Sequence, residues 1–154
     1  MAKDKGQVRR VLQILSLEDQ ETLAILHDPP LMEELLRRQE TLAEIRAAGL
    51  PGEAGEPLAD MGLPVRVFPA ALDELAGLPS MVRDALLDTH LPSLVEAPQE
   101  GLALTQLFQG LWIALCPVDG VNYRIVYECE PQEAGVTLLM VGTWSSLEER
   151  LEDD

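Results

Sequence analysis

Three apolar runs between Gly101 and Gly142 decide the fold of this chain: LWIALC at 111–116, YRIVYEC at 123–129 and VTLLMVG at 136–142. Only short, turn-rich segments separate them. PVDGV (Pro117–Val121) contains an Asp-Gly pair typical of a tight hairpin, and PQEAG (Pro131–Gly135) closes the next turn. Because hairpins join antiparallel neighbours, the sequence predicts an antiparallel β-meander with one conspicuous cation, Arg124, in its middle strand.

The segment before the meander reads as a short strand followed by two helices. Residues 65–69 alternate apolar and other side chains as a strand does. Leu72 and Leu75 indicate one face of a first helix, which ends near Gly77–Pro79. Ser80 can cap a second helix, and GLALTQLFQG (101–110) is expected to be a loop or turn. The resulting order is β-α-α-β-β-β, an α+β fold with two antiparallel helices on a sheet.

Two further helices are expected near the N-terminus. Ser16 is a suitable N-cap for the first helix, whose apolar residues include Leu17, Leu23 and Leu26. Asp28 precedes the second helix, and two prolines occupy its first turn without losing a needed hydrogen bond. Its apolar residues recur at spacings of three, four or seven and form a face for docking on the rest of the chain: Leu31, Leu35, Leu42 and Ile45.

Glycine and proline divide the chain into parts. Gly49 can end the second helix in the left-handed conformation, and GLPGEAGEPLADMGLP (49–64) holds too many helix and strand breakers for a regular element. We therefore expect a helical arm at 1–48, a Gly/Pro-rich linker at 49–64 and a domain at 65–154.

Composition limits the partners. The chain has 154 residues, 27 of them acidic and 11 basic, and its formal charge of −16 opposes binding to nucleic acid. Cys116 and Cys129 form no CxxC motif and have no neighbouring histidine, which argues against a disulfide scaffold or a zinc site. No segment has the length of a signal-peptide core or of a membrane span. We expect a cytoplasmic protein without a metal or cofactor.

The order and spacing of these elements resemble the RelE/ParE superfamily, the toxin half of bacterial toxin–antitoxin pairs. The resemblance covers roughly Val65 to Gly142 and is carried by LPSMVRDALLDTHLPSLVEAP, GLALTQLFQGLW, NYRIVYE and VTLLMVG. The arm carries a second resemblance, because GQVRRVLQILSLEDQETLAIL and DPPLMEELLRRQETLAEIRAAG are similar to the later part of Phd/YefM-type antitoxins. Together the two resemblances imply a toxin-like domain fused to its own antitoxin-like segment.

The resemblance implies a ribonuclease chemistry whose residues are mostly absent here. RelE-like toxins cut messenger RNA on the ribosome, and cations around the phosphate stabilise the developing charge. Arg124 matches the family arginine of the central strand. The preceding strand, where basic residues would alternate, reads WIAL at 112–115, and Thr143 and Trp144 follow the last strand where a basic pair would stand. The catalytic site that the resemblance implies is therefore eroded, with Arg124 as its vestige.

Charge and side-chain type leave other readings of this region open. From residue 65 onward four arginines face fifteen acidic residues, which opposes an approach to ribosomal RNA. Arg124 is equally a structural residue, paired with Glu128 or with a carboxylate of the arm. Trp112 and Trp144 are candidates for an exposed interface, and Tyr123 and Tyr127, which share a face, for packing or arm contact.

Three functions remain open from the sequence. The first is a catalytically eroded toxin–antitoxin fusion that acts as a protein-binding or regulatory module, with the arm docked in cis or exchanged in a swapped homodimer. The second is an mRNA interferase, active on the ribosome, that its own arm inhibits. The third is an acidic inhibitor whose acidic helices act as a charge mimic and bind a basic target. A membrane partner is not expected.

Overall fold

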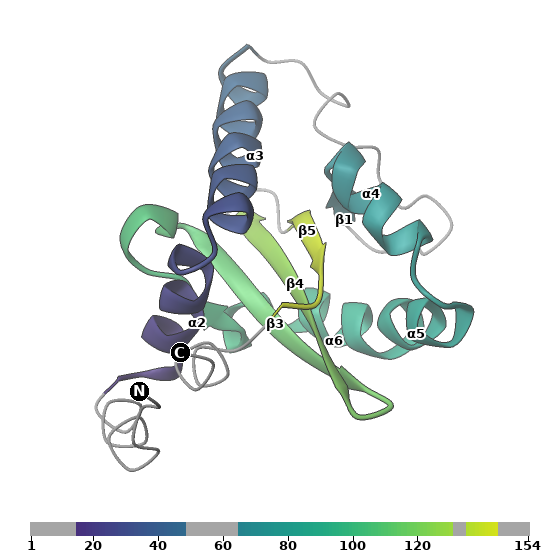
Figure 1. Cartoon of the computed structure of the whole chain (residues 1–154). Helices are drawn as coiled ribbons and strands as arrows, with labels where there is room; N and C mark the ends of the chain where they lie inside the picture. Colours follow the sequence, from purple (N-terminus) through teal and green to yellow (C-terminus); the bar gives the residue numbers. More distant parts are fainter. Residues whose placement is uncertain (1–14, 49–64, 131–134, 145–154) are drawn as a thin grey trace, which may run out of the picture.

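The structure is a computed structural model that describes residues 15–48, 65–130 and 135–144 (Figure 1). The side chains at 45–48, 130 and 135 lie outside this description, as do residues 1–14, the predicted linker at 49–64 with Gly49, the predicted turn residues 131–134 and the residues after Trp144. The elements form one five-stranded sheet with helices on both of its faces. The α+β class expected from the sequence is confirmed.

The centre of the sheet is the predicted meander. β3 (Leu111–Val118), β4 (Val121–Glu130) and β5 (Gly135–Gly142) are consecutive antiparallel neighbours. Asp119 and Gly120 form the β3–β4 turn with φ angles of 52° and 80°, the left-handed pair that an Asp-Gly hairpin requires. The sequence therefore predicted the meander and its first turn correctly.

Two short strands complete the sheet in the order β1-β5-β4-β3-β2. β1 (Val65–Val67) runs parallel to β5, and β2 (Leu102–Ala103) runs antiparallel to β3. The loop expected at 101–110 thus contains a strand, followed by the 3₁₀ turn η4 (Gln106–Phe108). Apart from these two strand residues the segment is a loop with turns, as expected, and tertiary packing orders it: Phe108 is fully buried, and the Leu104 N–H donates to the Leu111 carbonyl at 2.8 Å.

A helical hairpin covers one face of the sheet. α4 (Pro69–Ala76) begins at the proline that we had assigned to the strand, and its buried residues are Ala71 and Leu75, whereas Leu72 is exposed. The second helical segment comprises α5 (Ser80–Ala85), the π-helical turn η2 (Leu86–His90) and α6 (Leu91–Glu96), with η3 (Pro98–Glu100) after it. Ser80 lies inside α5, and its side chain makes no capping bond.

The π-helical turn has a local cause in the sequence. The Leu91 N–H donates to the Leu86 carbonyl, five residues back, immediately before Pro92. Proline has no N–H, and its ring would collide with the carbonyl four residues earlier in a regular α-helix. Widening the preceding turn therefore lets one helical segment continue past Pro92 across the sheet.

The arm covers the opposite face. α2 (Leu17–Leu26) begins at Ser16, whose hydroxyl accepts the Asp19 N–H at 3.1 Å, as the sequence predicts. α3 (Pro29–Ala48) begins after Asp28, whose carboxylate accepts the Leu31 N–H at 3.3 Å. No helix in the described ranges is both long and apolar enough to cross a membrane.

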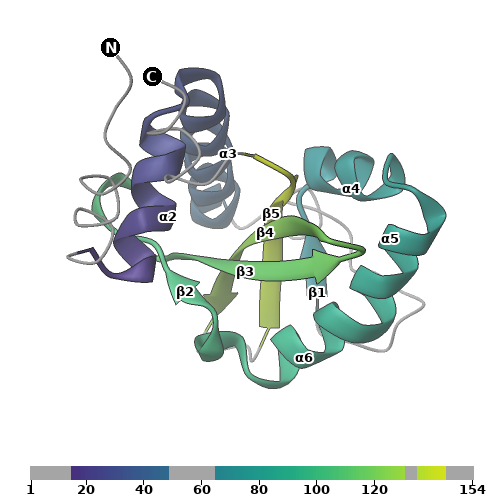
Figure 2. The ribbon, with the colours of Figure 1, turned by 60° about the horizontal axis from the view of Figure 1, so that its bottom comes forward.

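Two apolar clusters lie on the two sides of the strands. Figure 2 shows α2 and α3 on one side of the sheet and α5 and α6 on the other. We call the side covered by α4, α5 and α6 the hairpin face; its buried sheet residues are Val65, Val67, Cys116, Val118, Ile125, Tyr127, Val136, Leu138 and Val141. We call the side covered by α2 and α3 the arm face; its sheet residues are Leu111, Ile113, Val126, Leu139 and Met140. The helices of the arm therefore supply part of one of the two apolar clusters of the core.

Candidate functional site

Arg124 projects from β4 onto the arm face and is 5% exposed. Its Nε donates to Glu21 Oε1 at 2.7 Å, and its Nη2 approaches Glu21 Oε2 at 3.4 Å. Its Nη1 donates to the Trp144 carbonyl at 2.8 Å, and the guanidinium carbon lies 5.6 Å from the centroid of the Trp144 ring. Arg124 is thus buried, paired with a carboxylate and stacked on an indole ring.

The partner of Arg124 comes from the arm. Glu21 lies in α2, and its side chain is only 10% exposed in this ion pair. A buried ion pair loses the hydration of both groups, so it contributes only when its geometry and additional hydrogen bonds are good. The two guanidinium contacts with Glu21 and the third with a backbone carbonyl meet that condition. A phosphate could reach Arg124 only if α2 moved away.

Hydrogen bonds to a loop hold α2 in this position. The Thr105 N–H donates to Thr22 Oγ1 at 2.9 Å, and the Thr105 hydroxyl donates to Asp19 Oδ1 at 2.9 Å. Thr22 itself donates to the Glu18 carbonyl within the helix. The turn between β2 and β3 therefore fixes the rotation of α2 that directs Glu21 at the sheet.

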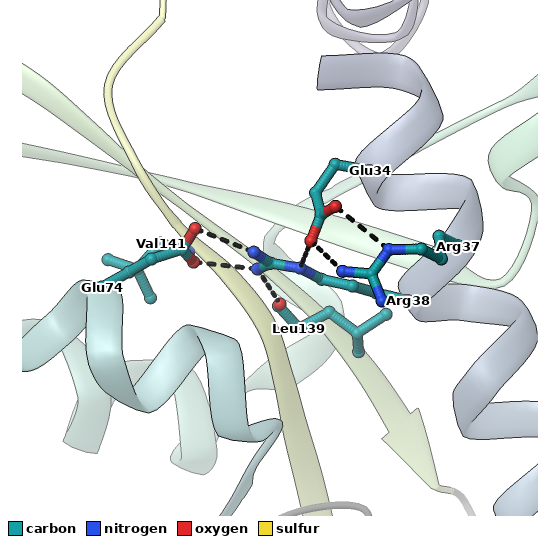
Figure 3. A network of polar contacts seen from close by, with 6 residues as sticks. All are labelled: Glu34, Arg37, Arg38, Glu74, Leu139 and Val141. Carbon is teal, nitrogen blue, oxygen red and sulfur yellow. Dashed lines mark hydrogen bonds and ion pairs between the residues drawn. The ribbon is translucent and has the colours of Figure 1, made fainter. Parts of the chain in front are cut away.

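A second buried arginine, Arg38 of α3, pairs with a carboxylate of α4 on the hairpin face (Figure 3). Arg38, 5% exposed, donates to both carboxylate oxygens of Glu74 in α4, at 2.9 and 3.0 Å. Its Nη1 also donates to the Leu139 carbonyl at 2.8 Å, and its Nε donates to Glu34 at 2.7 Å. Here the arm supplies the cation and the domain supplies the carboxylate.

The Arg38–Glu74 pair completes an open strand edge. β1 pairs with β5 only at residues 136–138, so no strand within the described ranges pairs with the next polar groups of the β5 edge. Arg38 donates to the Leu139 carbonyl, and Glu74 Oε1 accepts the Val141 N–H at 3.1 Å (Figure 3). The two side chains thus make the bonds that a longer β1 would make, which protects the edge from foreign strands.

The pKa shifts in this cluster follow from its hydrogen bonds. Bonds from Arg37 and then Arg38 lower the pKa of the Glu34 carboxyl below its ordinary value. Burial by itself would lower the pKa of Arg38, but the carboxylates of Glu74 and Glu34 outweigh it and raise that pKa. Arg38 therefore keeps its charge in the core at any physiological pH.

The aromatic candidates divide between the two faces. Trp144 packs with Arg124 on the arm face, whereas Trp112 and Tyr123 pack, partly buried, on the hairpin face. Tyr127 is buried on the hairpin face, and its hydroxyl donates to the Pro98 carbonyl at 2.7 Å. Burial, together with the negative charge that nearby thiols would carry, raises the pKa of Tyr127. The four aromatics therefore do not form one surface.

The apolar residues expected to dock the arm lie on the arm face as far as they are described. Leu35 and Leu42 are buried there with Ile25, and Leu31 is partly buried against them. The side chain of Ile45 lies outside the described residues. In α2 the buried residues are Glu21, Thr22, Ala24 and Ile25 rather than the leucines that the sequence pattern suggested.

Sequence reasoning missed Glu21, Arg38 and Glu74. A usable signal existed for Glu21, which precedes the buried Ile25 by one helical turn and so shares its face. Arg38 similarly stands between Leu35 and Leu42, at spacings of three and four. Charged residues within an apolar stripe are candidates for buried ion pairs. In the described ranges no group of three or more histidine, cysteine or carboxylate side chains could hold a metal ion.

No family model matches the chain, and no curated protein sequence matches it at a significant level. Solved structures that are similar to it include the RelBE toxin–antitoxin complex of E. coli, at 22% identity over 53% of this chain and 95% of that chain, with a TM-score of 0.45. The RelBE2 complex of Mycobacterium tuberculosis has 24% identity over 53% and 98%, with a TM-score of 0.46. A mutant E. coli RelE in complex with an antitoxin RelBc peptide has 23% identity over 60% and 94%, with a TM-score of 0.47. Nothing about activity follows from similarity at this level.

Proposed function

We propose that this chain is a toxin–antitoxin-derived protein in which a RelE-like domain (65–154) is fused to an antitoxin-like arm (1–48) that docks on it in cis. The protein acts as a protein-binding or regulatory module without ribonuclease activity. The observation that carries the proposal is the buried ion pair between Glu21 of the arm and Arg124 of the domain.

Charge at the vestigial site supports inactivity. A ribonuclease of this kind needs several cations around one phosphate, because charge develops there in the transition state. Arg124 is the one such residue that the sequence retains, and it already has a carboxylate, a carbonyl and an aromatic ring as partners. On the same face of β3, Ile113 is buried and apolar where an alternating basic residue would be needed.

The same ion pair favours one second candidate, a ribosome-dependent mRNA endonuclease that its own arm inhibits. In that case Glu21 would act as a lock, and movement of α2 would free Arg124 for substrate. The two candidates make different predictions for a protein in which the lock is weakened but the fold is kept. Glu21→Gln serves this purpose, because the amide keeps the shape and an acceptor oxygen while the charge is lost.

The activity test compares full-length wild type, Glu21→Gln and Glu21→Gln/Arg124→Gln for cleavage of messenger RNA on translating ribosomes, with a RelE toxin as the positive control. Glu33→Gln, an exposed change in α3, is the matched control. We expect no cleavage by any variant of this chain. Cleavage by Glu21→Gln that the added Arg124→Gln abolishes would replace inactivity with autoinhibition.

The docking test uses the full chain with a specific protease site placed within residues 49–64. Once the protease has cut this segment, the arm is no longer tethered to the domain. It then binds at its actual concentration and no longer at the effective concentration of roughly millimolar that a tether provides. We expect the two fragments to stay together in size-exclusion chromatography at micromolar concentration, because the buried Arg124–Glu21 pair, the partly buried Arg38–Glu74 pair and the apolar arm face join them. Separation of the fragments with retained secondary structure in both would contradict an antitoxin-like arm.

A further inference from the structure

A cavity of about 340 Å³ opens at the edge of β3. Leu17 at the start of α2 lines it from the arm face, Leu94 of α6 lines it from the hairpin face, and β3 residues from Ile113 to Cys116 line it between them. The cavity therefore straddles the edge of the sheet. A ligand bound there would contact the backbone of β3 as well as side chains from both faces.

The backbone of β3 is open along this cavity. β2 pairs with β3 only at Trp112 and Ile113, beside the first part of the strand (Figure 2). Leu111 accepts a hydrogen bond from the β2 side, and strand residues alternate in direction, so the N–H and C=O of Leu115 point to that same edge. In the described ranges no strand pairs with Leu115 there. An extended ligand could therefore pair with one backbone donor and one backbone acceptor of Leu115.

Two features limit this open stretch to a few residues. At one end the chain turns away from β3 at Gly101, between η3 and β2, so β2 does not extend to the position opposite Leu115. At the other end stands Pro117, which offers a C=O but no N–H to this edge. The edge therefore suits a short extended peptide and disfavours pairing with a long strand.

The side chains at this edge are apolar and exposed. Leu17 is 58% exposed and Leu115 is 41% exposed, and both line the cavity. Burying such surface stabilises a complex by about 25 cal/mol per Å² of apolar area. Because side chains of a strand alternate between its two faces, an added strand would place apolar groups against Leu17 on one face and Leu94 on the other.

Charges around the cavity indicate the chemistry of the ligand. The segments that surround it, 15–20, 86–103 and 111–118, contain no lysine or arginine, and His90 is their only histidine. Their carboxylates are Glu18, Asp19, Asp88, Glu96 and Glu100. Glu100 lines the cavity itself, and Glu96 is exposed close to it in the chain. This acidic surrounding attracts cations, in a chain whose total charge is −16.

The same charge disfavours a second copy of this chain as the occupant. Two copies joined at this edge would bring their carboxylates together, and each copy carries a charge of −16. A segment with apolar residues in its middle and basic residues at its ends matches both the apolar cavity and its acidic surroundings.

We propose that the open edge of β3 binds a short extended segment of a partner protein in which lysine or arginine flanks apolar residues. The segment adds to the sheet as a strand opposite Leu115, and its apolar side chains enter the cavity between α2 and α6. Its cations lie near Glu96 and Glu100. The inference rests on the proposed function in one respect, because it names the partner surface of the proposed protein-binding module.

The test uses the full-length protein and three short synthetic peptides with blocked termini. In the first peptide valine and threonine alternate, and lysine stands at both ends. The second has glutamate in place of each lysine. The third has proline in place of the central residue, which removes an N–H that could donate to the Leu115 carbonyl. NMR follows the chemical shift and the hydrogen exchange of the Leu115 amide in each titration.

We expect the lysine peptide to slow exchange of the Leu115 amide about tenfold at a concentration ten times its Kd. The glutamate peptide should bind about threefold more weakly or worse at low salt, and the proline peptide should give no protection. The Ile125 amide reports in every sample whether the fold is intact, and the Arg124 Nε–H reports whether α2 remains docked.

Two variants alter the receptor, each with a matched control. Leu17→Ala removes apolar contact and should weaken the lysine peptide about threefold or more, whereas Leu107→Ala, also at a residue that is 58% exposed, should not. Glu100→Gln should weaken it about twofold or more at low salt, whereas Glu33→Gln, an exposed change in α3, should not. Neither Leu107 nor Glu33 lines the cavity.

Three results would overturn the inference. The first is the absence of any shift of the Leu115 amide at roughly millimolar lysine peptide, or equal binding of all three peptides. The second is strong protection of Leu115 in the monomer without peptide, which would assign the edge to the chain itself. The third is protection that appears only in a dimer, which would assign it to a second copy. With the Arg124 signal unchanged, each of them leaves the docked arm of the proposed function intact, whereas separation of the two fragments after protease cleavage contradicts that arm whether or not the peptide binds.

Discussion

The two faces of the sheet are held by different physics. On the hairpin face the helices meet the sheet through close apolar packing, and its titratable groups, Cys116 and Tyr127, are buried in neutral form. On the arm face an apolar cluster is combined with the buried Arg124–Glu21 pair, and a second pair of opposite polarity, Arg38 with the partly exposed Glu74, joins α3 to α4. Close packing determines how the helices lie on the hairpin face, whereas ion pairs determine how α2 and α3 lie on the arm face.

This difference matters for what each face can do. An apolar interface tolerates many similar partners, whereas a buried ion pair penalises any arrangement in which one charge is left alone. Reciprocal pairs, with Glu21 and Arg38 on the arm and Arg124 and Glu74 on the domain, therefore set the register of α2 and α3 on the sheet.

The largest expected effect comes from breaking one pair on the arm face. Glu21→Ala leaves Arg124 buried without its carboxylate, and we expect the free energy of unfolding to fall by about 3–5 kcal/mol in urea denaturation. Replacing both residues by leucine should restore most of this loss, because neither charge then needs a partner. Glu33→Ala, which removes an exposed carboxylate, should change the free energy by less than about 0.5 kcal/mol. If Glu21→Ala hardly changes the free energy of unfolding, the Arg124–Glu21 ion pair does not determine how the arm lies on the sheet.

An intermediate loss of stability is expected at Gly101, where other atoms closely surround the backbone. A Cβ at Gly101 would overlap the Tyr127 hydroxyl and lie 3.1 Å from the Ile113 carbonyl oxygen. Gly101→Ala should therefore lower the free energy of unfolding by about 2 kcal/mol. Gly77→Ala, where the nearest atom to a new Cβ is 3.4 Å away, should be close to neutral.

A double-mutant cycle sharpens this prediction. Tyr127→Phe alone loses the hydrogen bond to the Pro98 carbonyl, at a cost of about 1 kcal/mol. Combined with Gly101→Ala it also removes the atom with which the new methyl group would collide. The double variant should thus be more stable than the sum of the single losses predicts. Strict additivity would mean that close packing is not what holds this face.

The sequence predicted the helices and central strands of both faces more fully than the contacts that join them. The meander, its Asp-Gly turn and the two N-terminal helices follow from local signals such as periodicity, turn residues and Ser16 as a cap. The strand β2 could not be predicted, since two residues carry no periodicity and its order comes from the burial of Phe108. The ion pairs join residues far apart in the chain, for example Arg124 with Glu21, and no local pattern specifies such partners.

The two faces should also differ in how the free energy of unfolding depends on pH. Burial raises the pKa of the Cys116 thiol from an ordinary 9.0 to about 12, so the folded protein holds the neutral thiol while the unfolded chain ionises. Stability from this group is therefore complete below pH 9 and falls as pH rises toward 12, by about 1.4 kcal/mol at pH 10. On the arm face the sign is opposite: the lowered pKa of Glu34 gives stability above pH 4.5 that is lost on acidification.

Urea denaturation at pH 8 and pH 10 should show the alkaline loss in wild type and a smaller loss in Cys116→Ala. An equal loss in both would place the alkaline sensitivity outside Cys116, with Tyr127 as the next group to test by Tyr127→Phe, because burial raises its pKa as well.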